Sequence, residues 1–287
     1  MRLLSLLAAI SLAAGLLACN LPVARSPAPG AVTSPTPPPA IATARTPRPP
    51  SSPIPTAEPS VGALAETVDA FLARCPTAEE IASVDADLVL TFEQDPTAGA
   101  LSCQAEDGSA DLTLLQQRGY QAVVLLRLIP FDAPLPWTNL ELYAWFTSTV
   151  NGIRFRGDIE ISSCCDSGGV MSIQTRNLAA LTTDDWIDPA GAAGMADLVV
   201  LFVHEARHNE GYSHTCGPDD NTMGEMGAWA VQAYLWDWLA DHADPAFLTP
   251  DEGPANRYRE LARWAAYDIR GSRFCQEPPP PSPQPIS

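Results

Sequence analysis

Three of the four histidines in the chain, His204, His208 and His214, fall within eleven consecutive residues. His204 and His208 are four residues apart, so on a helix their imidazoles share one face and can bind one metal ion. Glu205 follows the first histidine, where its carboxylate can reach a metal-bound water without binding the metal. Gly211 can adopt a positive φ angle, end the helix and turn the chain so that His214 supplies a third ligand. Three histidine ligands leave a fourth position open for water or substrate, which is typical of catalytic zinc.

The pattern His204-Glu205-x-x-His208-x-x-Gly211-x-x-His214 resembles the extended zinc motif of the metzincin metallopeptidases. The resemblance covers only these eleven residues. It implies a zincin-like domain, Zn2+ as the cofactor, and hydrolysis of protein or peptide substrates. In that scheme the three histidines hold the zinc and Glu205 is the general base.

Two alternatives concern the residues that follow the motif. Metzincins have a methionine-containing turn beneath the metal, for which Met223 and Met226 are candidates, with ordinary core packing as the other interpretation. In the gluzincin class of metallopeptidases the third ligand is a glutamate on a downstream helix, and Glu225 opens such a helix. We favour His214, because Gly211 has no purpose in the gluzincin scheme; Glu225 would then hydrogen-bond a ligand histidine.

Five other side chains near the motif are weighed as parts of the site. Trp229, Gln232 and Trp236 fall on or near one face of the downstream helix, where we expect them to pack behind the site rather than contact substrate. Tyr212 and Tyr234 are candidates to polarise a substrate carbonyl, although a structural role is the favoured interpretation for both.

The periodicity of apolar residues predicts an α+β fold, helix-rich with a small sheet, as a zincin-like domain would be. A strand is expected at 87–92. A hairpin is expected where 159–163 and 170–175 flank Asp166-Ser167-Gly168-Gly169, and 170–175 is also a candidate edge strand for binding extended peptide. Helices are expected at 61–73, 112–128, 140–150, 194–208, 225–240 and 255–270.

The N-terminus has the features of an export signal. Met1 and Arg2 precede an apolar stretch that is too short for a confident membrane span, and it ends in Leu16-Leu17-Ala18-Cys19. This resembles the lipobox of bacterial lipoproteins, which implies cleavage of residues 1–18 and lipidation of Cys19, for example by palmitate. The protein is therefore expected to be exported and lipid-anchored at the outer face of a bacterial membrane.

Composition divides the remaining chain into a tether, one domain and a tail. Residues 19–60 carry the lipidated cysteine and are rich in Pro, Ala, Ser and Thr, so they bury too little apolar surface to fold. Residues 61–277 form the predicted metallopeptidase-like domain. Residues 278–287 are expected to be a Pro-rich disordered tail.

Six cysteines remain after Cys19, and an even number in an exported protein predicts up to three disulfides. Because Cys164 and Cys165 are adjacent, we expect them to pair with two different partners rather than with each other. Cys216 lies close to the histidines, so a thiolate metal ligand is the alternative there. The disulfide candidates are Cys75, Cys103, Cys164, Cys165, Cys216 and Cys275.

The formal net charge is -18 and all 16 basic residues are Arg. Such an acidic chain lacks the basic footprint of a nucleic-acid-binding protein, so nucleic acid is excluded as a partner. The expected partners are a protein or peptide substrate and, through the lipid anchor, the membrane. A non-catalytic metal-binding or structural surface lipoprotein is the alternative function, but a pure binding site has no use for the carboxylate of Glu205.

The lipid anchor is tested by Cys19→Ala. Removal of the acylated side chain takes away the membrane affinity, so the protein should move to the soluble fraction or remain unprocessed. Membrane fractionation and intact mass measure the effect. A variant with unchanged fractionation and unchanged mass would contradict the lipoprotein prediction.

Overall fold

The structure is a computed structural model, and it describes residues 68–104, 111–129, 135–176, 178–181, 186–187, 194–241 and 252–283. The predicted signal peptide, Cys19 and the tether lie outside the described residues, as do residues 284–287 of the tail. No helix in these ranges is both long and apolar enough to cross a membrane.

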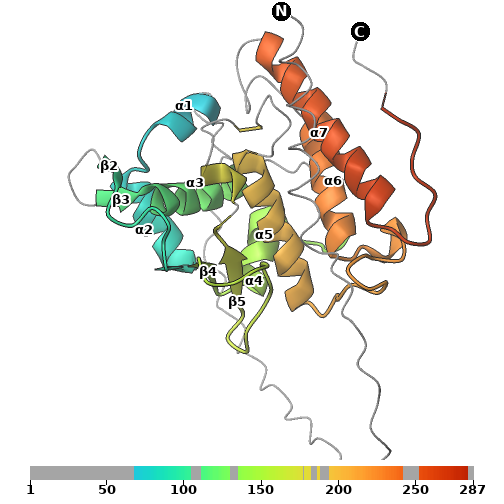
Figure 1. The fold of residues 1–287 in the computed structure, drawn as a ribbon, viewed down its shortest axis with the longest axis horizontal. Coiled ribbons are helices and arrows are strands. Elements are labelled where there is room, and N and C mark those ends of the chain that lie inside the picture. The colour runs from blue at the N-terminus through green and yellow to red at the C-terminus, as the bar shows by residue number, and fades with distance from the viewer. Residues whose placement is uncertain are drawn as a thin grey trace, which may run out of the picture. The chain divides into compact units, whose positions relative to one another are not determined.

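Seven helices and a small sheet are found among the described residues, which confirms an α+β fold (Figure 1). The bounds of the third to seventh helices agree with the predicted ranges to within three residues, whereas the second helix is not predicted. The helices are α1 (Val68–Ala73), α2 (Ala78–Asp87), α3 (Leu114–Leu128), α4 (Leu142–Thr149), α5 (Met195–Asn209), α6 (Ala228–Asp241) and α7 (Glu252–Ser272), with single 3-10 turns at Ala179–Leu181 and Met223–Glu225.

Capping boxes define where α2 and α3 begin. The Thr77 side chain accepts a hydrogen bond from the backbone N–H of Glu80, and the Glu80 carboxylate accepts one from the backbone N–H of Thr77. Thr113 and Gln116 make the same reciprocal pair at the start of α3. Each box satisfies donors that the first turn of a helix leaves without partners.

Helix α5 is buried in the middle of the domain. It packs against α3, α4 and α6, and α6 in turn packs against α7 (Figure 1). Leu198, Val199, Val200, Phe202 and Val203 of α5 are fully buried, because the helix is apolar around most of its circumference. The core therefore surrounds the helix that carries the first two histidines of the motif.

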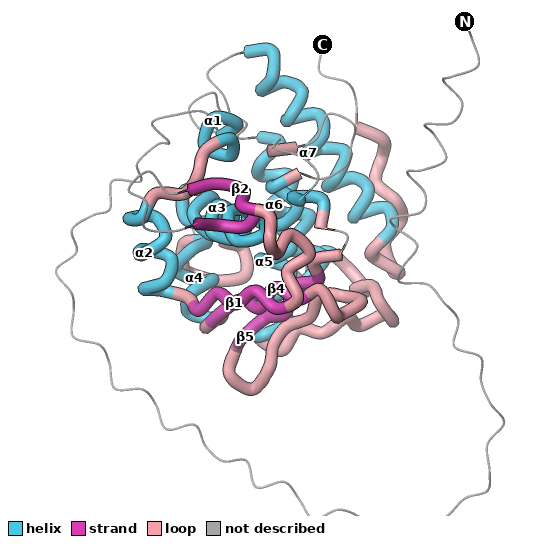
Figure 2. The backbone as a smooth tube through the Cα atoms, turned by 60° about the vertical axis from the view of Figure 1, so that its left-hand side comes forward, coloured by secondary structure: helices cyan, strands magenta, loops and turns pink. Residues whose placement is uncertain are grey.

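The main sheet has three parallel strands in the order β1 (Val89–Glu93), β4 (Gly152–Arg156) and β5 (Val170–Gln174), shown in Figure 2. Phe155 of β4 stacks on Phe92 of β1 with ring centroids 5.1 Å apart, and its other neighbour is Phe202 of α5 at 6.2 Å. These rings join the sheet to the central helix. A separate antiparallel pair is formed by β2 (Leu101–Gln104) and β3 (Asp111–Thr113).

The predicted hairpin at 159–175 is only partly correct. Residues 170–174 form a strand, and Asp166 accepts hydrogen bonds from Gly168 and Val170 in the expected turn. Residues 159–163, however, contribute a single antiparallel bridge, between Ser163 and Ser172. The full partner of β5 is β4, because β4 can pair with it over five residues in register.

The structure pairs the six cysteines as Cys75–Cys103, Cys164–Cys165 and Cys216–Cys275. The expectation that Cys164 and Cys165 bind two different partners is therefore wrong, because the other four cysteines form two disulfides with one another. Cys216 is disulfide-bonded in this arrangement and has no thiolate to offer a metal.

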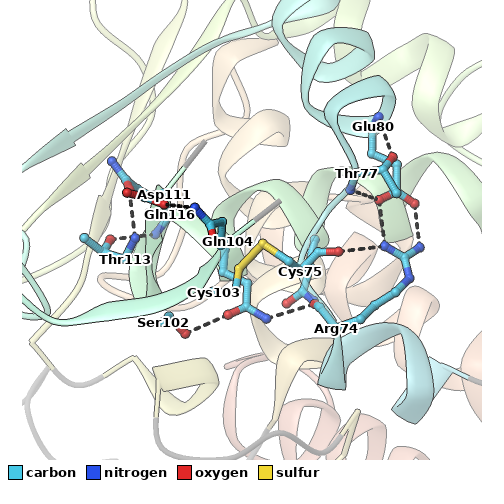
Figure 3. The surroundings of a disulfide bond; sticks show 12 residues. Arg74, Cys75, Thr77, Glu80, Ser102, Cys103, Gln104, Asp111, Thr113 and Gln116 are labelled. Atoms are coloured by element: carbon cyan, nitrogen blue, oxygen red, sulfur yellow. Dashed lines mark hydrogen bonds and ion pairs between the residues drawn. A yellow bond between two sulfur atoms is a disulfide. The ribbon is translucent and has the colours of Figure 1, made fainter. Parts of the chain in front are cut away.

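The Cys75–Cys103 disulfide lies beside a polar clamp on the end of α1 (Figure 3). Arg74 forms an ion pair with Glu80 at 2.7 Å, next to the capping box of α2. The side-chain amide of the fully buried Gln121 donates to the carbonyls of Phe71, Leu72 and Arg74 at 2.8–3.2 Å. The clamp satisfies carbonyls that the short helix α1 cannot satisfy itself.

The first part of the Pro-rich tail lies against α7. Residues 278–283 are described, and the hydroxyl of Ser282 is 3.4 Å from that of Tyr267. Pro279 lies close to Gly271 of the same helix. Residues 278–283 form no helix or strand, and the expectation of a disordered tail stays a prediction.

The clamp on α1 predicts a large effect for Gln121→Met. The new side chain has a similar volume but removes three donated hydrogen bonds and the Oε1 acceptor of the buried Arg118 guanidinium, so the free energy of unfolding should fall by about 2 kcal/mol. Denaturant unfolding measures the change. Gln104→Met is the matched control, because the Gln104 side chain is exposed and its amide donates to Asp111 at the surface. Equal losses in the two variants would contradict the clamp.

Candidate metal centre

Helix α5 ends where the motif requires a turn. Its last helical residue is Asn209, and Gly211 has a φ angle of 91°. The N–H of Gly211 donates to the carbonyl of His208 at 3.0 Å, which closes the last turn. A residue with a Cβ is strained at this φ angle, so the predicted role of Gly211 as a helix stop is confirmed.

The turn brings His214 back to His204 and His208. Ring centroids are 5.0 Å apart for His204 and His208, 5.4 Å for His204 and His214, and 4.7 Å for His208 and His214. One ring nitrogen from each lies within 4.8 Å of the other two, and this is the group of metal-binding side chains found in the described ranges. The three histidines can therefore hold one metal ion.

Two of the three rings are oriented by hydrogen bonds on the nitrogen that faces away from the group. His208 Nδ1 lies 2.6 Å from the carbonyl oxygen of Tyr212, and because a carbonyl only accepts, this nitrogen is the donor. His214 Nδ1 lies 3.0 Å from Asp220 Oδ1. Bonds of this kind fix the tautomer and leave Nε2 free to bind a metal.

His204 is the most buried of the three. Burial lowers the pKa of His204 well below its usual value, and the neighbouring His208 and His214 lower it further. Its Nδ1 and the Oε1 of Gln232 are both buried, and neither has a hydrogen-bond partner at normal geometry among the described groups. The nearby Gln232 side chain opposes part of the lowering of the His204 pKa. Burial also lowers the pKa of His208. Both rings are thus neutral near neutral pH, which is the form that binds metal.

Glu205 is buried with its carboxylate only partly satisfied. Burial raises the pKa of Glu205 to about 7, while a hydrogen bond from the backbone N–H of Cys164 opposes the rise. Its Oε2 is buried and has no partner among the described groups. A buried polar atom without a partner is costly in a folded protein, so this oxygen is suited to a group that arrives with the metal or the substrate.

Asp220 is a part of the site that the sequence analysis misses. Its side chain is buried; Oδ1 faces His214, and Oδ2 accepts the backbone N–H of Trp229 at 3.0 Å in the first turn of α6. A Cβ atom at Gly227 would lie 2.5 Å from Oδ2, so a larger residue there would displace the Asp220 carboxylate. The sequence signal is weak, because Asp219 is adjacent and equally acidic.

Glu225 does not join the three histidines. It is exposed, and its carboxylate accepts hydrogen bonds from Thr215 Oγ1 at 3.1 Å and Asn221 Nδ2 at 3.3 Å. No hydrogen bond to a ligand histidine is found for it among the described residues. The hydrogen bond to a ligand histidine that the sequence suggests for Glu225 is instead made by Asp220, to His214.

The two methionine candidates flank a turn that is tied to α5. Met226 has a φ angle of 50°, and its carbonyl accepts a hydrogen bond from Arg207 Nε at 2.7 Å. The guanidinium of Arg207 also lies 3.5 Å from the ring centroid of Tyr212. Met223 and Met226 are both half-buried against the core. Arg207 thus connects the zinc-motif helix, the turn and the residue whose carbonyl orients His208.

The aromatic side chains near the motif pack against the histidines, Arg207 and the core. Trp229 meets His204 edge-on at 4.4 Å and lies nearly parallel to His214 at 5.7 Å, while Trp236 is buried in the core. The ring of Tyr212 is exposed and lies against Arg207, while the backbone carbonyl of Tyr212 bonds His208. Tyr234 packs edge-on against Trp137.

Comparison with the models of known protein families, with curated proteins and with solved structures finds no match. The functional interpretation therefore depends on the geometry around His204, His208 and His214.

Proposed function

We propose that the protein is a zinc-dependent metalloendopeptidase with a zincin-like domain, exported and anchored by a lipid on Cys19. The observation that carries the proposal is the convergence of His204, His208 and His214 beside the buried carboxylate of Glu205. The three disulfides support export, because disulfides persist in oxidising compartments.

The donor set fits zinc better than a harder cation. Three imidazole nitrogens suit zinc and related transition metals, whereas calcium and magnesium require oxygen ligands. The Oε2 atom of Glu205 is buried without a hydrogen-bond partner among the described groups, and a water held at the metal site would supply one. When bound, zinc supplies Lewis acidity toward the substrate carbonyl and lowers the pKa of the attacking water.

Glu205 moves the proton in the proposed reaction. Its free carboxylate oxygen accepts a proton from the water that attacks the peptide carbonyl. The same group then delivers that proton to the leaving amine nitrogen, so the bond between carbonyl carbon and nitrogen breaks with a neutral amine as product. His208 and His214 keep their orientation through Tyr212 and Asp220.

The edge that we propose for binding substrate is one segment outside the predicted strand. The strand at 170–174 pairs along its whole length with β4. On its other side it has one bridge, in which Ser163 exchanges two backbone hydrogen bonds of 2.8 and 2.9 Å with Ser172. In an antiparallel pair the neighbours of Ser163 direct their backbone groups away from β5. The backbone N–H of Cys164 donates a hydrogen bond to the carboxylate of Glu205. An extended peptide that lies beside residues 162–164 would therefore pass close to the proposed general base.

The proposed mechanism predicts that Glu205→Gln separates metal binding from catalysis. Glutamine keeps the size of the side chain but cannot accept a proton, so zinc should stay near one ion per chain while peptide hydrolysis falls by about 10² or more. Metal analysis and cleavage of a peptide library are the measurements. Glu79→Gln, an exposed change in α2, is the control.

Two outcomes of this experiment would reject parts of the proposal. Full activity of Glu205→Gln would exclude it as the general base. A parent protein that binds zinc but cleaves no peptide would favour the non-catalytic metal-binding lipoprotein.

The identity of the third ligand is tested by zinc affinity. His214→Ala removes a direct bond and should release zinc, whereas Glu225→Ala alters an exposed side chain and should change affinity by about twofold or less. Competition with a chromophoric chelator gives both values. Zinc that survives His214→Ala but leaves on Glu225→Ala would replace the metzincin-like site with the gluzincin-like one.

A further inference from the structure

We propose that residues 273–277, at the end of α7, are part of the metal centre because they hold the loop that orients His214. We call these residues the C-terminal clasp. This inference rests on the proposed metal site, and its subject is the third ligand rather than the reaction.

The third ligand differs from the other two in what supports it. His204 and His208 belong to a buried helix, whereas His214 lies in the loop between α5 and α6. Most side chains of this loop from 210 to 219 are exposed. The loop therefore needs contacts from elsewhere to keep its histidine in register with α5.

Asp220 is the point at which those contacts meet. Its side chain holds His214 and the start of α6, while its main chain pairs with the clasp. The N–H of Asp220 donates to the carbonyl of Arg273 at 3.0 Å, and the carbonyl of Asp220 accepts the N–H of Cys275 at 3.1 Å. Displacement of the clasp would thus displace the carboxylate that orients His214.

Further bonds extend the pairing along the loop. The Cys216–Cys275 disulfide joins residues 59 positions apart in the sequence. Asn221 accepts both the backbone N–H and the side-chain N–H of Gln276 at 3.1 Å, through its carbonyl and its Oδ1. The carboxylate of Glu277 accepts the N–H of Met223 at 2.7 Å.

The clasp is also fixed to the core and to the aromatic neighbour of the histidines. Phe274 is buried, so the segment is anchored between its polar contacts. The guanidinium of Arg273 lies 3.3 Å from Asp219 and 4.4 Å from the ring centroid of Trp229. Trp229 in turn contacts His204 and His214. The clasp therefore reaches the site by two routes, through Asp220 and through Trp229.

The test is the zinc affinity of the full chain, measured by competition with a chromophoric chelator. Cys216→Ser/Cys275→Ser should bind zinc about 10 to 100-fold more weakly, the scale for losing an outer partner of a metal ligand. The matched control is Cys75→Ser/Cys103→Ser, which removes another disulfide and should change affinity by about twofold or less. Equal losses in the two double variants would overturn the proposal.

A second arm tests whether the effect passes through Asp220. In an Asp220→Ala background, breaking the Cys216–Cys275 bond should cost about threefold or less, because the group that it positions is already gone. Additive losses would overturn the proposal. If circular dichroism shows that the serine variant does not fold, Asn221→Ala/Gln276→Ala keeps all three disulfides and should still weaken zinc binding; unchanged affinity would count against the clasp.

These outcomes are separate from failure of the proposed function. A parent chain that binds no zinc would reject the metal site itself. A parent chain that binds zinc without hydrolysing peptides would leave the affinity comparison intact.

Discussion

The burial of α5 is the constraint on which the candidate site depends. A helix that is apolar on nearly every face must be enclosed, and α3, α4, α6 and the sheet enclose it. The polar residues of its last turns then sit at the boundary of the core, where water is excluded on one side. Burial keeps His204 and His208 neutral, and it leaves a carboxylate oxygen of Glu205 in need of a partner.

The site combines two kinds of support. The helix gives His204 and His208 a fixed separation, which requires only local hydrogen bonds and close packing. His214 depends instead on the buried carboxylate of Asp220 and on Gly227, which leaves room for that carboxylate. It also depends on the pairing of Asp220 with residues 273–275. Asp220 links these supports, because one side chain bonds His214 and caps the next helix at the same time. A larger residue at Gly227 would therefore displace Asp220 and change the orientation of His214, although Gly227 and His214 are thirteen positions apart in the sequence.

The sequence predicts the features that arise from local spacing. The histidine trio, the stop at Gly211 and five of the helices follow from period and residue type. Strand β4 is missed because the residues that pair with it in β1 and β5 are distant in the sequence, as Gly152 and Val170 show. Asp220 is missed for a similar reason: nothing in a run of polar loop residues distinguishes it from Asp219. Its importance comes from its contacts with His214, Trp229 and residues 273–275. The adjacent cysteines are misjudged because pairing by elimination requires knowledge of the other four.

The Cys216–Cys275 connection also has a consequence for timing. During synthesis the two helical histidines and His214 emerge well before residues 273–277, since 59 positions separate the bonded cysteines. If the clasp positions Asp220, a chain that is still being made or exported has the ligands but not the arrangement that holds the third one. The centre is then completed at a late stage of maturation, in the compartment where the disulfide forms. The proposed metal loading would then be delayed until this last disulfide has formed.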